Sequence, residues 1–382
     1  RALTIAEGLT SHREEWEAHY GELEAFLLPR RGNFSRNPAD RAKTKRGAEA
    51  VNKKMLDSTP RQALRISQSG MQSGLTSPSR PWFRWQLADP DQRDNPEAKR
   101  YVARAVTEAR QLLQQAGFYN AMHTSYGDNL VYGTECTLVE DDDETGLRFT
   151  QLVPGTFWLG LSDKNFVDTC LREFAMTVNQ LVGKFVFGGN PFANEPDWSV
   201  VPQRVKTMYD KGQVSEFVTV HQLITPRRER DTRKADGANK PVASNYWLDE
   251  AQGSDKQGLL GVRGYDRNPV VASRWEVNGF GVYGMSPGMD ALPDVKELMD
   301  KKRDYSEMLR RVNRPPMNAH SDLRNSSFSL MPDTVNFMAD PSKGLRPAFE
   351  VSPQFAPLRD SIQDTRDQVW SALYADLFMM IS

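Results

Sequence analysis

The chain has 382 residues, of which 38% are hydrophobic and 26% are charged, and its formal net charge is -1. This length predicts two or three structural units, and near-neutrality excludes the long-range field with which a strongly basic protein attracts nucleic acid. Apolar stretches fall far short of the roughly 18 residues of a membrane span. Because the hydrophobic share is low for a self-contained enzyme, we expect a heavily solvated or oligomer-forming protein without a membrane segment, in which any contact with DNA is local.

The N-terminal third is predicted to be mainly helical. Apolar residues recur every three or four positions over residues 4–28, which is typical of an amphipathic helix. Two more helices are expected, one capped by Thr59 with Pro60 in its first turn, and one over residues 96–115. Between the first two, residues 30–46 form a basic, loop-like run, which is most often a solvated face and otherwise a contact for phosphate or a partner.

Most of the strands are predicted in the middle of the chain. Residues 131–149 alternate in polarity around an acidic turn at Thr145 and Gly146, the pattern of a β-hairpin. Helical spacing follows over 172–187 and over 200–209. We expect four further β-like runs to form a compact α+β insertion between helices: 217–224, 246–248, 259–265 and 270–277.

A charged helix is predicted over residues 292–313, and a last helix from Leu358 into the C-terminus. The charged helix has one apolar face, and its other face alternates in sign every three or four residues, at Lys296, Asp300, Arg303, Glu307, Arg310 and Arg314. Such a stripe either forms ion pairs within its own helix or pairs with a neighbouring copy in a ring. Its predicted length is roughly 33 Å, enough to line a passage, and mixed charge would let DNA slide where a basic lining would hold phosphates.

Two nucleotide-binding patterns precede this helix. A G-x-G-x-x-G is formed by Gly279, Gly281 and Gly284, but a dinucleotide site needs a helix directly after the glycines, and here we expect the helix to be delayed by residues 285–288. A phosphate loop would need lysine where Met285 stands. Both patterns are interpreted as a tight glycine turn.

A third pattern is the G-x-S-x-G around Ser286, which is typical of a hydrolase nucleophile. The residue after the nucleophile normally donates its N–H to the oxyanion, and Pro287 has none. We therefore expect Ser286 to start a turn that leads into the helix.

No metal or redox site is predicted. Asp141 and Asp143 imitate the start of a calcium loop, but Leu152 stands where a bidentate glutamate is required, so a solvated hairpin tip is the better interpretation. Histidines 12, 19, 123, 221 and 320 are scattered, and Cys136 and Cys170 are expected to be buried free thiols. We predict that the protein is not an enzyme and has no cofactor. Because the chain starts at Arg1 and stops inside a helical pattern, we expect both ends to continue in a longer protein.

Short motifs follow one another along almost the whole chain. They include Asp57-Ser-Thr59, Ser73-Gly-Leu-Thr-Ser-Pro-Ser79, Pro81-Trp-Phe83, Arg172-Glu-Phe174, Ser286-Pro-Gly288, Ala291-Leu-Pro-Asp294 and Pro315-Pro316. Each is weak alone. Their ordered combination resembles the head-to-tail connecting, or portal, proteins of short-tailed bacteriophages.

The resemblance implies an α+β portal fold with wing, stem and clip regions, long stem helices, and a ring of about twelve subunits. The regions would be an N-terminal wing at 1–170, a first stem helix region at 171–197, a clip-like insertion at 198–280, a second stem helix at 281–314, a channel-loop region at 315–357, and the truncated start of a tunnel or wing helix at 358–382.

The function implied by the resemblance is that of a structural virion protein at one capsid vertex. The ring would form in the host cytoplasm, conduct double-stranded DNA during packaging and ejection, and join head to tail. Its partners would be the packaging ATPase (terminase), tail adaptor or tail proteins, and capsid and scaffold proteins. The charged stripe would supply inter-subunit stem contacts, and the possible DNA or partner contacts are Arg30, Arg31, Lys43, Lys45, Arg46, Arg324 and Lys343. A serine hydrolase using Ser286 and another head–tail adaptor component stay open as alternatives.

Overall fold

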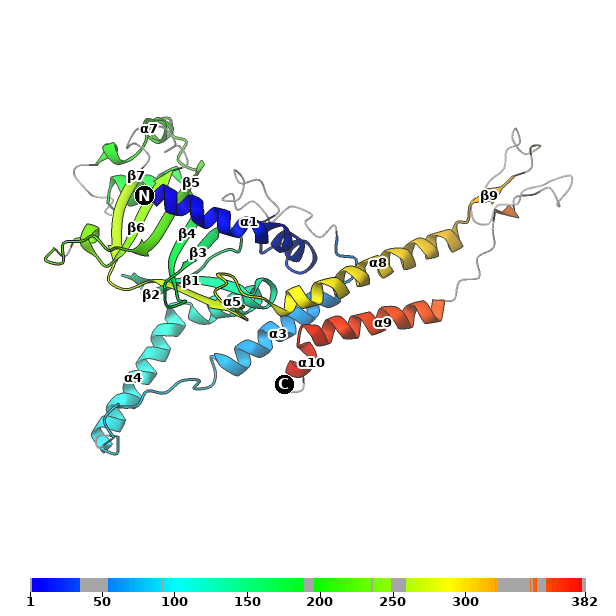
Figure 1. Cartoon of the computed structure of the whole chain (residues 1–382), viewed down its shortest axis with the longest axis horizontal. Helices are drawn as coiled ribbons and strands as arrows, with labels where there is room; N and C mark the ends of the chain where they lie inside the picture. Colours follow the sequence, from blue (N-terminus) through cyan, green and yellow to red (C-terminus); the bar gives the residue numbers. More distant parts are fainter. Residues whose placement is uncertain are drawn as a thin grey trace.

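The computed structural model describes residues 2–34, 54–90, 93–188, 196–234, 236–248, 259–319, 321, 344, 346–348 and 355–379. Two antiparallel sheets lie at one side, and long helices extend away from them (Figure 1). The described chain is α+β, as the sequence predicted. None of its helices is both long and apolar enough to cross a bilayer.

The larger sheet has five strands in chain order, each antiparallel to the next. They are β3 (Phe157–Leu161), β4 (Val167–Thr177), β5 (Phe217–Pro226), β6 (Val242–Leu248) and β7 (Leu259–Tyr265). Between β4 and β5 the chain forms α6 (Val178–Leu181), a π-helix η1 (Val182–Val186), a 3-10 turn η2 (Trp198–Val200) and α7 (Gln203–Asp210). Another 3-10 turn, η3 (Gly237–Asn239), precedes β6.

The smaller sheet has the order β2-β1-β8. The predicted hairpin is confirmed: β1 (Thr134–Asp142) and β2 (Gly146–Gln151) pair around an acidic tip, where the Asp142 carboxylate accepts the Thr145 N–H at 3.1 Å. β8 (Val270–Arg274) returns to the other edge of β1. Cys136 of β1 and Cys170 of β4 lie in one apolar cluster, both fully buried and free, as predicted.

One prediction about the middle of the chain was wrong. The helix expected over 172–187 begins only at Val178, where Thr177 and Gln180 form a capping box, because residues 172–177 pair with β5 and Arg172 also pairs with β3. The strands of the predicted insertion are shared between the two sheets: β5, β6 and β7 continue the sheet from β4, while β8 joins β1. Long-range strand pairing overrides local spacing here, because the hydrogen-bond partners come from distant parts of the chain.

The long helices match the sequence prediction more closely. They are α1 (Ala2–Phe26), α3 (Thr59–Leu75), α4 (Pro96–Gln115), α5 (Phe118–Tyr132), α8 (Pro287–Asn313) and α9 (Phe355–Ala372). The predicted final helix is interrupted after α9, where Tyr374 has a φ of 59°, and continues as α10 (Ala375–Met379). Helix α5 was not predicted, because it is buried around most of its circumference and its sequence shows no amphipathic period.

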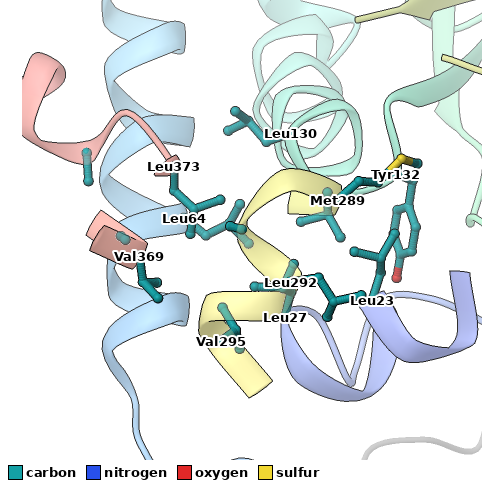
Figure 2. Packing of buried hydrophobic residues seen from close by; sticks show 14 of the residues in the cluster. Leu23, Leu27, Leu64, Leu130, Tyr132, Met289, Leu292, Val295, Val369 and Leu373 are labelled. Carbon is teal, nitrogen blue, oxygen red and sulfur yellow. The ribbon is translucent and has the colours of Figure 1, made fainter. Parts of the chain in front are cut away.

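One hydrophobic core joins α1, α3, α5, α8, α9 and α10 (Figure 2). Leu23 of α1, Leu130 of α5, Val295 of α8 and Val369 of α9 are each 0% exposed. These residues come from the beginning, middle and end of the chain, so the core joins segments that are distant in sequence. This core holds the first half of α8 in place. The second half of the helix extends from that anchored part.

Candidate functional site

The glycine turn that leads into α8 lies against the junction of α5 and β1. The Trp275 N–H donates to the Gly133 carbonyl oxygen, and the Gly284 N–H donates to Thr134 Oγ1, both at 2.8 Å. A Cβ added to Gly133, whose φ is 67°, would lie 2.3 Å from the Gly284 carbonyl oxygen. Glycine is therefore required for close approach of two backbones, and the turn is a packing device.

Ser286 is the N-cap of α8. Its hydroxyl donates to the Val131 carbonyl oxygen at 2.7 Å and accepts the Met289 N–H at 3.2 Å, and the residue is only 2% exposed. A hydroxyl has one proton to donate, and this one is committed to a backbone carbonyl. No histidine of the described chain hydrogen-bonds to Ser286. The serine therefore secures a helix and lacks the surroundings of a nucleophile.

The start of α8 corrects one expectation. The helix begins at Pro287, directly after the turn, and not near residue 292 as the Ser-Pro-Gly sequence suggested. Proline suits the first helical position because its missing N–H would have no intrahelical partner there. The dinucleotide interpretation fails for a different reason than the one expected: the strand before the turn, β8, is antiparallel to β1 and belongs to no parallel βαβ unit.

The two halves of α8 differ in their surroundings. Its buried residues all lie between Pro287 and Met299. Beyond Met299 the helix leaves the core with α9 beside it (Figure 1), and Tyr305, Met308 and Leu309 are only half-buried. The second half of α8 therefore presents surface on every side that α9 does not cover.

Polar and aromatic contacts hold α9 against α8. Lys301 Nζ donates to Thr365 Oγ1 at 2.8 Å, and the Tyr305 and Phe355 rings meet edge to face at 6.1 Å. Past the end of α8, β9 (Met317–Asn318) pairs with β10 (Arg346–Pro347). The segment that follows α8 therefore lies beside the segment that precedes α9.

A buried carboxylate at Asp57 connects three of these helices. Its Oδ2 lies 2.8 Å from Arg366 of α9 and 3.4 Å from Lys302 of α8, and its Oδ1 accepts the Thr59 N–H of α3 at 2.9 Å. Burial opposes ionisation of Asp57, but the hydrogen bonds from Thr59 and Arg366 outweigh it and lower the pKa to about 2. Thr59 was expected to be the cap of α3. It is instead the first helical residue, and Asp57 accepts its N–H.

Part of the charged stripe of α8 forms ion pairs within the chain. Lys296 lies 2.8 Å from Glu22 of α1, Arg303 lies 2.9 Å from Asp300, and Glu307 lies 3.9 Å from Arg311. Arg310 and Arg314 are exposed near the end of the helix. Because exposed pairs are worth little, most of these charges can exchange partners.

The predicted DNA or partner contacts fall into three groups. Arg31 is held by the buried Asp128 carboxylate at 2.7 Å and donates to the Leu152 carbonyl oxygen at 3.1 Å, so its guanidinium is engaged within the chain. Arg30 is exposed. The others lie outside the described residues: Lys43, Lys45, Arg46, Arg324 and Lys343. No cluster of potential metal ligands occurs in the described part of the chain.

Comparison with known proteins decides the family. The family model described as bacteriophage head to tail connecting protein matches residues 1–382. The chain belongs to this family. It is 35% identical over 384 residues to the portal protein of Salmonella phage epsilon15, covering 100% of the chain and 66% of the relative. It is 30% identical over 376 residues to the probable portal protein of Bordetella phage BPP-1, covering 98% of the chain and 64% of that relative. The chain therefore spans just under two thirds of the length of each of these two relatives.

Proposed function

We propose that the protein is a structural portal subunit, which forms a ring at one capsid vertex, conducts double-stranded DNA and connects head to tail. The observation that carries the proposal is the α8–α9 pair in a chain of the connector family. One half of α8 is fixed in the core, and the other half offers half-buried apolar residues and exchangeable charges. Such a surface is suited to a second helix pair of the same kind.

The charge of α8 supports its proposed place beside DNA. The helix has 27 residues, which gives a length of about 40 Å. Its sequence contains six acidic and six basic residues, so its net charge is zero. A neutral lining releases few counterions on contact with phosphates and therefore does not hold the duplex in place. DNA can then slide past α8 in either direction.

The regional assignment follows from this placement. In the proposed ring, α8 is the second stem helix, and α6 with η1 is what remains of the first. The paired strands β9 and β10 mark the start and end of the channel loop. Terminase, tail adaptor or tail proteins, and capsid and scaffold proteins are the proposed partners, with assembly in the host cytoplasm and no catalytic role for the chain.

Electron microscopy of the purified full-length protein, viewed along the ring axis, tests the proposal. We expect closed rings with a central hole. Arg310→Glu should reduce the fraction of rings, because it places a negative charge on the proposed contact face. Lys164→Glu, an equal charge change at an exposed turn of the larger sheet, should leave that fraction unchanged. A protein that stays monomeric under all assembly conditions would refute the proposal.

A further inference from the structure

Helix α4 is an arm that extends away from the sheets (Figure 1). None of its 20 residues is buried, although its sequence is amphipathic. Most helix stability in proteins comes from the packing of an amphipathic face against other elements. The apolar face of α4 is therefore incompletely covered by the described residues.

The base of the arm is anchored. The Trp82 and Phe118 rings stack at 5.6 Å, and Phe118 meets Phe149 of β2 edge to face at 5.2 Å. Leu112 approaches the hairpin tip so closely that a Cβ on Gly146 would lie 2.9 Å from its Cδ1. The arm thus leaves the body at a fixed place, next to the β1–β2 hairpin.

The outer part of the arm carries an open apolar groove. The extended segment 81–87 lies along α4 and forms with it a groove of about 490 Å³ that includes Phe83, Trp85 and Val102 in its lining. Trp85 lines the groove and is 53% exposed, and Tyr101, on the outer part of α4 but outside the groove lining, is 74% exposed. Tryptophan and tyrosine are among the residues that most often supply binding energy in protein contacts.

Charge indicates what covers this groove. Arg84 and Arg100 are exposed on the outer part of the arm and form no ion pair with any described residue. The hairpin tip carries the opposite charge: Asp141, Asp143 and Glu144 are exposed and likewise form no ion pair within the described chain.

A single chain cannot bring these two surfaces together. The hairpin tip lies beside Leu112, twelve residues from Arg100 along α4, which corresponds to about 18 Å. That separation exceeds a Debye length at physiological salt. A second copy of the same chain carries the same acidic hairpin tip and is not limited by this separation. Two different patches on one chain also make the head-to-tail contact that closes a ring.

We propose that the outer part of α4 and segment 81–87 dock on a second copy of the chain, with Trp85 and Tyr101 buried at the contact and Arg84 and Arg100 facing the acidic hairpin tip of that copy. This inference rests on the proposed ring, and it adds a second contact between neighbouring subunits, remote from α8.

Sedimentation velocity of the full-length protein over a concentration series tests the apolar part. Trp85→Glu and Tyr101→Glu should each weaken self-association roughly tenfold or more, as expected for buried aromatic residues at a contact. Phe166→Glu is the matched control, because Phe166 is 70% exposed in the β3–β4 turn and should have no effect. Far-UV circular dichroism verifies that each variant retains its helix content.

A charge exchange tests the partner surface independently of folding. Arg100→Glu and Asp143→Arg should each reduce self-association, and the double variant should recover most of the loss. If all these variants form rings as the unmodified protein does, the inference is wrong and the proposed ring stands. Normal rings that fail to enter capsids would show that the arm binds another virion protein, which also overturns the inference. An unmodified protein without rings would refute the proposed function itself.

Discussion

The Asp57 carboxylate should contribute measurably to the free energy of unfolding of the protein. Its side chain is 3% exposed, and it bonds to Arg366, Lys302 and the start of α3. Its pKa falls from an ordinary 3.8 to about 2, and at 1.36 kcal/mol per unit this corresponds to roughly 2 to 3 kcal/mol of stability at neutral pH. Asp57→Asn keeps the shape and removes the charge, so the free energy of unfolding should fall by about 2 to 3 kcal/mol.

The pH dependence of this effect has a definite sign. Because the folded pKa is lower than the unfolded one, the stabilisation is complete above pH 4 and is lost as the pH falls towards 2. Chemical denaturation at pH 7 and at pH 3 should therefore show a large difference between Asp57 and the Asn variant at the higher pH and a smaller one at the lower.

An exposed charge on the same helix pair is the control for this experiment. Asp300→Asn removes a carboxylate that is 67% exposed and, among the described residues, bonds only to Arg303 one turn away, so its cost should stay below about 0.5 kcal/mol. Equal stability of the Asp57→Asn variant and the unmodified protein at pH 7 would contradict the reasoning, as would a difference that does not change with pH.

Three further substitutions test the start of α8 and its core. Ser286→Ala should lower the free energy of unfolding by about 1 to 2 kcal/mol, because it removes the N-cap and the hydrogen bond to the Val131 carbonyl. Ser286 should not react with a fluorophosphonate. Labelling of this serine would support the hydrolase hypothesis. Gly133→Ala should lower the melting temperature by several degrees because of its positive φ and its contact with Gly284, whereas Gly8→Ala in α1, with open space around it, should not; equal effects would contradict the packing role of the turn. Leu298→Ala should cost about 2 to 5 kcal/mol in chemical denaturation, since this side chain is 0% exposed, and a cost under 1 kcal/mol would mean that the first half of α8 is not fixed in the core.

Local patterns were sufficient for several elements. The amphipathic period revealed α1, helix start and stop signals revealed α4, the acidic turn revealed the β1–β2 hairpin, and the spacing of charges and apolar residues revealed most of α8. The order of short motifs was enough to indicate the connector family, which the comparison over the whole chain confirms. The rejection of a nucleophile at Ser286 was also possible beforehand, since the absence of an N–H in Pro287 is a property of the residue itself.

The sequence by itself therefore determined the family, through the order of its motifs. It also determined the elements whose exposed and buried residues alternate along the chain, because that alternation is a local property. Tertiary structure decided the rest. Residues 172–177 have helical spacing, but they form the second half of strand β4 because β5, a distant segment of the chain, pairs with them. Helix α5 has no readable period because its neighbours surround it. The bond between Asp57 and Arg366 joins residues 309 positions apart, and no local pattern can report a contact that exists only once the chain has closed its core.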